Sequence, residues 1–200
     1  MPDRVVVLIS GTGSNLGDLL SRCEARANPP VEVVAVGADR DATGLSHAIP
    51  RGIPTFVVSP VEFSSRDQWG VALGDEVAAY SPDLVVLSGF MRLVPPGFVA
   101  RFSQHLINTH PAYLPEFPGA HAVEDQIAAG VNQAGASVIT VDDGVDTGPI
   151  LAQQRVAVEP HDTVESLHDR IKHVERELLW QVLRERTWAN APTQGESATR

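Results

Sequence analysis

The segment of this chain most suggestive of chemistry holds an amide and an imidazole two residues apart. Asn108 and His110 end a strand-like run, so their side chains project from the same side of the predicted strand. An amide N–H can stabilise an oxyanion, and an imidazole can transfer protons near neutral pH. A proline-rich loop that contains Glu116 and His121 follows directly. We interpret Asn108 and His110 as catalytic rather than as two structural side chains.

A second segment places three carboxylates within five positions, at Asp142, Asp143 and Asp146. They do not fit the twelve-residue calcium loop, which ends in a glutamate. The sequence also lacks a second dense cluster of acids and histidines, so a metal site is the weaker interpretation, beside a simple solvated turn. We favour a carboxylate here that orients and charges His110.

A third segment, the glycine-rich run 11–15, lies between a predicted strand and a predicted helix. Glycines let a ligand approach the backbone, and the N–H groups at a helix start attract an anion. No Lys-Ser/Thr pair follows as in a P-loop, and Gly17 comes one residue late for G-x-G-x-x-G. One alternative is a tight turn capped by Ser14 or Asn15. Another is a dinucleotide site that uses Asp39 as its acid. We favour a phosphate site.

Hydrophobic patterning indicates the elements that position these segments. Short apolar runs are typical of strands buried on both faces, and they occupy 4–9, 31–36 and 83–88. Weaker strand-like runs occupy 54–58, 105–109, 136–141 and 150–158. Helical spacing covers 16–27, 43–51, 66–80 and 163–186. The alternation predicts an α/β fold: a single Rossmann-like domain over 1–186, with about seven mostly parallel strands and helices on both faces. A flexible tail is expected at 187–200.

Composition narrows the classes of partner and compartment. With 25 acidic and 15 basic side chains the net charge is −10, which argues against nucleic-acid binding. The single cysteine, Cys23, lies in a predicted helix and is expected to be packed rather than catalytic. No apolar run approaches the ~20 residues of a membrane helix, and no signal peptide is evident. We expect a cytoplasmic protein that binds small molecules and no membrane.

Four motifs also occur together in the order and spacing of a known family. They are Ser10-Gly-Thr-Gly-Ser-Asn15, Gly89-Phe-Met-Arg92, Asn108-Thr-His-Pro111 with Leu114-Pro115, and Asp146-Thr-Gly-Pro149. Over residues 4–186 the chain therefore resembles the folate-dependent phosphoribosylglycinamide formyltransferases of the formyltransferase superfamily. The resemblance implies transfer of a formyl group from 10-formyltetrahydrofolate to the amine of glycinamide ribonucleotide in purine biosynthesis, with no metal.

The same resemblance implies a role for each site residue. Asn108 and His110 would stabilise the tetrahedral oxyanion, while Asp146 would keep His110 charged and assist proton transfer. The ribonucleotide would be bound by Gly13, Ser14, Asn15 and Glu175. The folate would be bound by Arg66, Met91, Arg92, Leu93, Val94, Asn108, Asp142, Asp143, Gly144, Val145 and Asp146. His121 would lie near the site. For Glu175 the alternative is an ordinary charge on a solvated helix face.

Three other functions compete with this one. A methionyl-tRNA formyltransferase would need a basic surface and an additional C-terminal domain, and the charge of −10 counts against it. A formyltetrahydrofolate hydrolase would carry an additional N-terminal domain, which we do not expect here. A non-catalytic nucleotide-binding module would explain the glycine-rich run but would leave Asn108, His110 and Asp146 without a task. The expected assembly is a monomer or a homodimer.

Overall fold

The structure, a computed structural model, describes residues 1–190 and forms one seven-stranded sheet in the order β3-β2-β1-β4-β5-β6-β7. β1 pairs in parallel with β2 and β4, β2 pairs in parallel with β3, and β6 and β7 are antiparallel. The predicted α/β fold with about seven mostly parallel strands is confirmed. The strands are β1 (Asp3–Ile9), β2 (Val31–Ala38), β3 (Thr55–Val57), β4 (Leu84–Leu87), β5 (Leu106–His110), β6 (Gln133–Thr140) and β7 (Ile150–Ala157).

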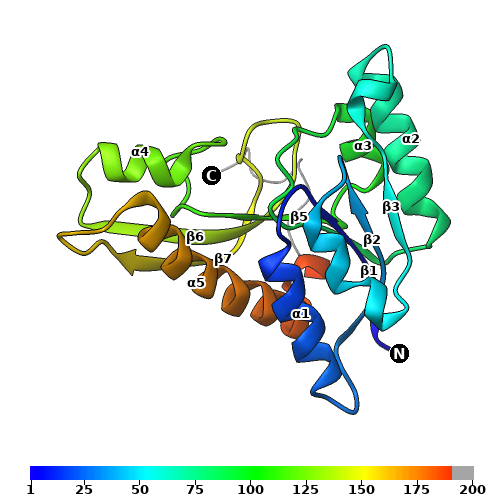
Figure 1. Ribbon diagram of the computed structural model, residues 1–200, viewed down its shortest axis with the longest axis horizontal. Helices are drawn as coiled ribbons and strands as arrows, with labels where there is room; N and C mark the ends of the chain where they lie inside the picture. The colour runs from blue at the N-terminus through cyan, green and yellow to red at the C-terminus, as the bar shows by residue number, and fades with distance from the viewer. Residues whose placement is uncertain (191–200) are drawn as a thin grey trace. The chain divides into compact units, whose positions relative to one another are not determined.

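Two compact units divide the chain, the first over residues 1–107 and the second from residue 108 onward, and β5 begins in the first and ends in the second. In the first unit, five consecutive residues of β1, 5–9, have no exposed surface. β1 has a parallel neighbour on each side, and helices lie over both faces, so an uninterrupted apolar run is what this position requires. Figure 1 shows α1 (Ser14–Glu24) on one side of these strands and α2 (Arg66–Ala79) with α3 (Pro96–Arg101) on the other.

Two helix predictions for the first unit need correction. Residues 43–51 were expected to form one helix, but they form two 3-10 turns, η1 (Thr43–His47) and η2 (Ile49–Arg51). Pro50 lacks an N–H group, and its ring clashes with the preceding turn of an α-helix, so the helix cannot run through it. α3 was not predicted at all because prolines surround it. A third short turn, η3 (Pro60–Glu62), precedes α2.

The helical spacing predicted over 66–80 places Trp69, Leu73 and Val77 on one face of α2, and all three are buried. Cys23, on α1, is half-buried, and this burial raises the pKa of its thiol to about 11. A thiol with so high a pKa is a poor nucleophile at neutral pH, in agreement with the predicted packing role.

In the second unit, the long helix α5 (Val164–Glu185) packs along β6 and β7. It begins with a capping box in which the Thr163 side chain accepts from the Ser166 N–H and the Ser166 side chain accepts from the Thr163 N–H. Its C-cap is Arg186, whose backbone is left-handed. The predicted helix at 163–186 is confirmed, whereas α4 (Ala122–Ala128) was not predicted.

The first four residues of the predicted tail are described by the structure. Residues Thr187–Asn190 form the 3-10 turn η4, in which Trp188 is buried. Residues 191–200, the rest of that predicted tail, lie outside the described part of the chain. Among residues 1–190, no helix has the length and apolarity needed to cross a membrane.

Candidate active site

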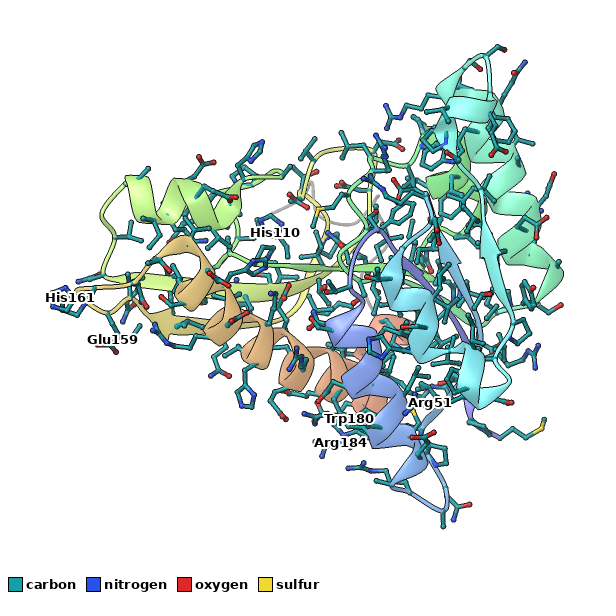
Figure 2. The ribbon with its side chains drawn as sticks, in the orientation of Figure 1. Arg51, His110, Glu159, His161, Trp180 and Arg184 are labelled. Atoms are coloured by element: carbon teal, nitrogen blue, oxygen red, sulfur yellow. The ribbon has the colours of Figure 1, made fainter. Side chains whose placement is uncertain are left out.

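His110, labelled in Figure 2, lies at the carboxyl end of β5 and is buried. An oxygen atom faces each of its ring nitrogens. Its Nε2 is 2.9 Å from the carbonyl oxygen of Phe117, and its Nδ1 is 3.4 Å from Oδ2 of Asp146. A neutral imidazole can donate only one hydrogen bond, whereas an imidazolium donates two. The ring is thus held between two oxygen atoms, one at each nitrogen.

Asp146 connects the other predicted catalytic residues. Its Oδ1 accepts from Nδ2 of Asn108 at 3.5 Å, and its Oδ2 accepts from the backbone N–H of Gly119 at 2.8 Å. Its backbone is left-handed, with φ at 54°, a conformation that aspartate and asparagine tolerate better than most residues. The structure thus brings Asn108, His110 and Asp146 together in one cluster, as the sequence predicted.

The acidic loop that precedes Asp146 is closed by its own side chains. Oδ1 of Asp142 accepts from the N–H of Gly144 at 3.0 Å and from the hydroxyl of Thr147 at 2.7 Å. This is the turn-forming use of aspartate, and it leaves Asp143 and Val145 exposed. Within residues 1–190 no group of three His, Cys, Asp or Glu side chains could hold a metal ion.

A second loop, 111–119, supplies backbone groups that sequence reasoning missed. The Phe117 carbonyl faces His110, and the Gly119 N–H binds Asp146, but a backbone group has no signature in residue type. The loop is held in place by buried side chains: Nε2 of Gln126 donates to the Pro111 carbonyl at 2.9 Å. The one available sequence signal was the proline and glycine content, which predicted a loop of fixed shape.

The glycine-rich run ends at the first turn of α1, and the structure does not show the cap by Ser14 or Asn15 that was the alternative to a phosphate site. Neither Ser14 nor Asn15 is the N-cap; Gly13 is, in a left-handed conformation, and no side-chain cap hydrogen bond forms. A Cβ on Gly13 would lie 3.0 Å from the Cα of Gly44, so a close approach also requires glycine there. A helix start without a side-chain cap is well suited to an anion, because an anion can take the place of the cap.

Asp39 is 1% exposed, and two guanidinium groups surround its carboxylate. Nη2 of Arg40 lies 2.8 Å and Nε of Arg92 lies 2.7 Å from Oδ2. Burial alone would raise the pKa of Asp39, but hydrogen bonds from Arg40, Ser10 and Arg92 outweigh burial and lower it. A carboxylate committed to two arginines is not available for a ribose, which counts against the dinucleotide alternative.

The predicted folate segment 91–94 is held by two side chains of the first unit. The hydroxyl of Ser10 accepts from the N–H of Met91 at 2.8 Å. Arg66 donates to the carbonyls of Leu93 at 2.9 Å and Val94 at 3.0 Å. Arg66, predicted to meet a folate carboxylate, thus also has a structural task. The side chains of Met91 and Leu93 are exposed, at 61% and 57%, and Val94 is buried.

Glu175 is 5% exposed and lies on the buried stripe of α5, four residues after Ile171. The alternative that it is an ordinary solvated charge is therefore wrong. His121, in contrast, is exposed and precedes α4 without capping it through its side chain.

Comparison with known proteins gives consistent similarities. A profile of the formyl transferase family matches residues 3–183. The phosphoribosylglycinamide formyltransferase of Mycobacterium tuberculosis (strain H37Rv) is 51% identical over 178 residues, which cover 89% of this chain and 82% of that protein. The enzyme of the same name from Escherichia coli (strain K12) is 36% identical over 168 residues, 84% of this chain and 79% of that one. Glycinamide ribonucleotide transformylase 1 from Symbiobacterium toebii superimposes with a TM-score of 0.91 at 37% identity, covering 97% of this chain and 92% of that structure.

Proposed function

Because this chain belongs to the formyl transferase family, among the phosphoribosylglycinamide formyltransferases, we propose that it transfers a formyl group from 10-formyltetrahydrofolate to the primary amine of glycinamide ribonucleotide. The products are formylglycinamide ribonucleotide and tetrahydrofolate, in de novo purine biosynthesis. The observation that carries the proposal is the cluster in which Asp146 lies within hydrogen-bonding reach of Asn108 and 3.4 Å from the His110 ring.

The reaction forms one C–N bond and breaks another. The substrate amine attacks the formyl carbon, and the carbonyl oxygen becomes an oxyanion. Nδ2 of Asn108 carries two N–H groups, of which one faces Asp146 and the other is available to the oxyanion. Both nitrogens of His110 already face protein oxygens, so the imidazolium stabilises the oxyanion through its positive charge. Asp146 accepts a proton from the amine and delivers it toward N10 of the folate as the C–N10 bond breaks.

The binding roles rest on separate observations. We assign the substrate phosphate to Gly13, Ser14 and Asn15, because α1 begins there without a side-chain cap. Glu175 is assigned to the ribonucleotide, since its buried carboxylate can accept from hydroxyl or amine donors.

For the folate we assign the segment 91–94 together with the loop 142–146. Their exposed apolar side chains, Met91, Leu93 and Val145, suit the flat ring of a pterin. Arg66 and Asn108 complete the folate assignment.

The proposal also covers the substrates, the compartment and the assembly of the protein. Both substrates are small molecules, and the steps above route no charge through a metal. We place the reaction in the cytoplasm, in a formyltransferase domain over residues 1–186 that acts as a monomer or homodimer without nucleic acid.

A steady-state assay that follows folate absorbance tests the function directly. Turnover that requires both 10-formyltetrahydrofolate and glycinamide ribonucleotide is expected. Turnover without the ribonucleotide would indicate a hydrolase, and tight folate binding without turnover would indicate a binding module. His110→Ala is the companion variant: it should retain ligand binding and lose turnover, because the imidazolium is removed.

A further inference from the structure

The loop that carries the Phe117 carbonyl is fastened to strand β7 by an ion pair. Nη1 and Nη2 of Arg155 each lie 2.6 Å from one carboxylate oxygen of Glu116, in the two-bond geometry that gives the strongest carboxylate–guanidinium pairs. The same guanidinium lies over the ring of Tyr113, 3.8 Å from its centroid. Arg155 therefore contacts the loop at two points, three residues apart.

A second side chain of β7 contacts the same loop. Nε2 of Gln153 donates to the carbonyl of Leu114 at 3.0 Å. Gln153 and Arg155 are two residues apart on one strand, so both project from the same face of β7. From β6, the hydroxyl of Ser137 accepts from the Leu114 N–H and donates to the Ala112 carbonyl. The loop is thus held at residues 112–114 by polar contacts and at 116 by a charge pair.

Phe117 follows the last of these contacts, and its backbone is in a strained conformation. Its φ is 51°, in the left-handed region that a residue with a bulky side chain rarely adopts. Such a conformation persists only where neighbouring contacts hold it. The Phe117 carbonyl is the acceptor 2.9 Å from Nε2 of His110, so a relaxation of Phe117 would remove one of the two acceptors that orient the ring.

We propose that Glu116 and Arg155 are positioning residues: their ion pair fixes Phe117, and through its carbonyl the orientation of His110. The proposal rests on the formyl-transfer function above. Both side chains are exposed, and exposed ion pairs contribute little to global stability. The expected effect of breaking this pair is therefore on kcat, with little effect on folding.

The test compares Glu116→Gln, Arg155→Gln and the double variant in the full chain. Each single variant is expected to lower kcat about 5- to 20-fold, because a displacement of a fraction of an ångström at the reacting groups is costly. Both KM values should stay within about 2-fold, since neither residue is assigned to a substrate. The double variant should be no slower than the slower single variant, because both changes remove one interaction. Arg155→Lys keeps the charge but not the paired geometry, so its kcat should be intermediate.

A matched control exists in the other unit. Arg51 holds Glu24 by a similar exposed two-bond pair, with distances of 2.8 and 2.9 Å. Glu24→Gln removes an equivalent ion pair at the opposite end of α1 from the assigned Ser14 and Asn15, so it should leave kcat unchanged. Salt provides a second comparison: raising NaCl from about 0.05 M to about 0.5 M should lower kcat in the wild type and leave Glu116→Gln unaffected, because salt screens exposed charge pairs.

An NMR signal of His110, which does not depend on activity, separates the positioning role from the proposed formyl-transfer function. The Nε2–H of His110, hydrogen-bonded to Phe117, should give a slowly exchanging signal in nitrogen-15 NMR spectra of the wild type and of Glu24→Gln. In Glu116→Gln the signal should broaden or disappear. An unchanged signal and unchanged kcat in both Glu116→Gln and Arg155→Gln would overturn the positioning role. If the wild type transfers no formyl group but the His110 signal still depends on Glu116, the proposed function fails and the positioning role survives.

Discussion

Asp146 is the residue whose substitution tests the catalytic cluster with least disturbance of its surroundings. Asn has the same shape and tolerates the left-handed backbone, so Asp146→Asn should fold normally. The imidazolium of His110 loses its charge partner, and we expect kcat to fall by about 10³- to 10⁴-fold. Steady-state kinetics with circular dichroism as a folding check measures both effects. Wild-type turnover in this variant would contradict the role given to Asp146.

Ser14 gives a test in which stability and affinity move in opposite directions. In Ser14→Asp the carboxylate lies in the first turn of α1, where it stabilises the free protein by about 0.3–1 kcal/mol through the helix dipole. The same charge repels a phosphate, so KM for glycinamide ribonucleotide should rise at least about 10-fold. Ser21→Asp, two turns further along α1, is the control and should leave that KM unchanged. A wild-type KM for glycinamide ribonucleotide in Ser14→Asp would contradict the assignment of the phosphate site to the start of α1.

Asp39 makes a prediction about pH. Its pKa is lowered in the folded protein, so its stabilising effect is complete above the unfolded value of about 3.9 and is lost as the pH falls through the folded value. The wild type should therefore lose more free energy of unfolding between pH 5 and pH 3 than Asp39→Asn does. At pH 7 the variant should be less stable by about 1–3 kcal/mol, because the hydrogen bonds from two arginines weaken. Urea unfolding of both proteins from pH 3 to pH 7 measures the free energy of unfolding at each pH. If that free energy changed with pH equally in the wild type and in Asp39→Asn, an ionised Asp39 would be excluded.

At the scale of elements, the turn between β6 and β7 depends on one residue without a side chain. A Cβ on Gly148 would lie 1.7 Å from the carbonyl oxygen of Thr140, so Gly148→Ala must displace the backbone near Asp146. We expect a loss of about 1–3 kcal/mol in stability and a lower kcat. Gly97→Ala, in α3, is the control: nothing lies within 4 Å of its Cβ, so it should be neutral or stabilising. Thermal unfolding and steady-state kinetics measure the stability and kcat of both variants. Equal stability and equal kcat in Gly148→Ala and Gly97→Ala would contradict the close contact between Gly148 and the Thr140 carbonyl.

The sequence predicted those helices and strands that have a strong hydrophobic pattern. It did not predict the short helices and turns whose pattern is interrupted by prolines or polar loops. β1 was recognisable because its short apolar run is typical of a buried strand. α5 was recognisable because its long apolar stripe is typical of a helix packed on one face. Residues 43–51 have helical spacing, but Pro50 stops the helix, and the short helices α3 and α4 lie among prolines and polar loops. In the site, residue type and spacing indicated Asn108 and His110. The burial of Glu175 depends on how α5 packs against β6 and β7, which no local pattern contains.

At the scale of the whole chain, the net charge of −10 predicts which large partners are absent. A polyanion such as tRNA should show no binding by fluorescence anisotropy, even at about 0.05 M NaCl where charge attraction is strongest. It should also leave formyl transfer to glycinamide ribonucleotide uninhibited. Saturable, salt-sensitive tRNA binding would favour the methionyl-tRNA formyltransferase alternative instead.

The two terminal strands of the sheet have a further consequence, for association between copies. A terminal strand exposes a template on which another chain can build, and proteins block such templates with very short strands or with charged and polar side chains. β3 is only three residues long, and β7 carries Gln153, Gln154 and Arg155 in its middle. Pairing of a strand from a second molecule with β3 or with β7 is therefore disfavoured. Copies of this protein should therefore resist edge-to-edge aggregation when concentrated, and a homodimer would have to form through helices or loops.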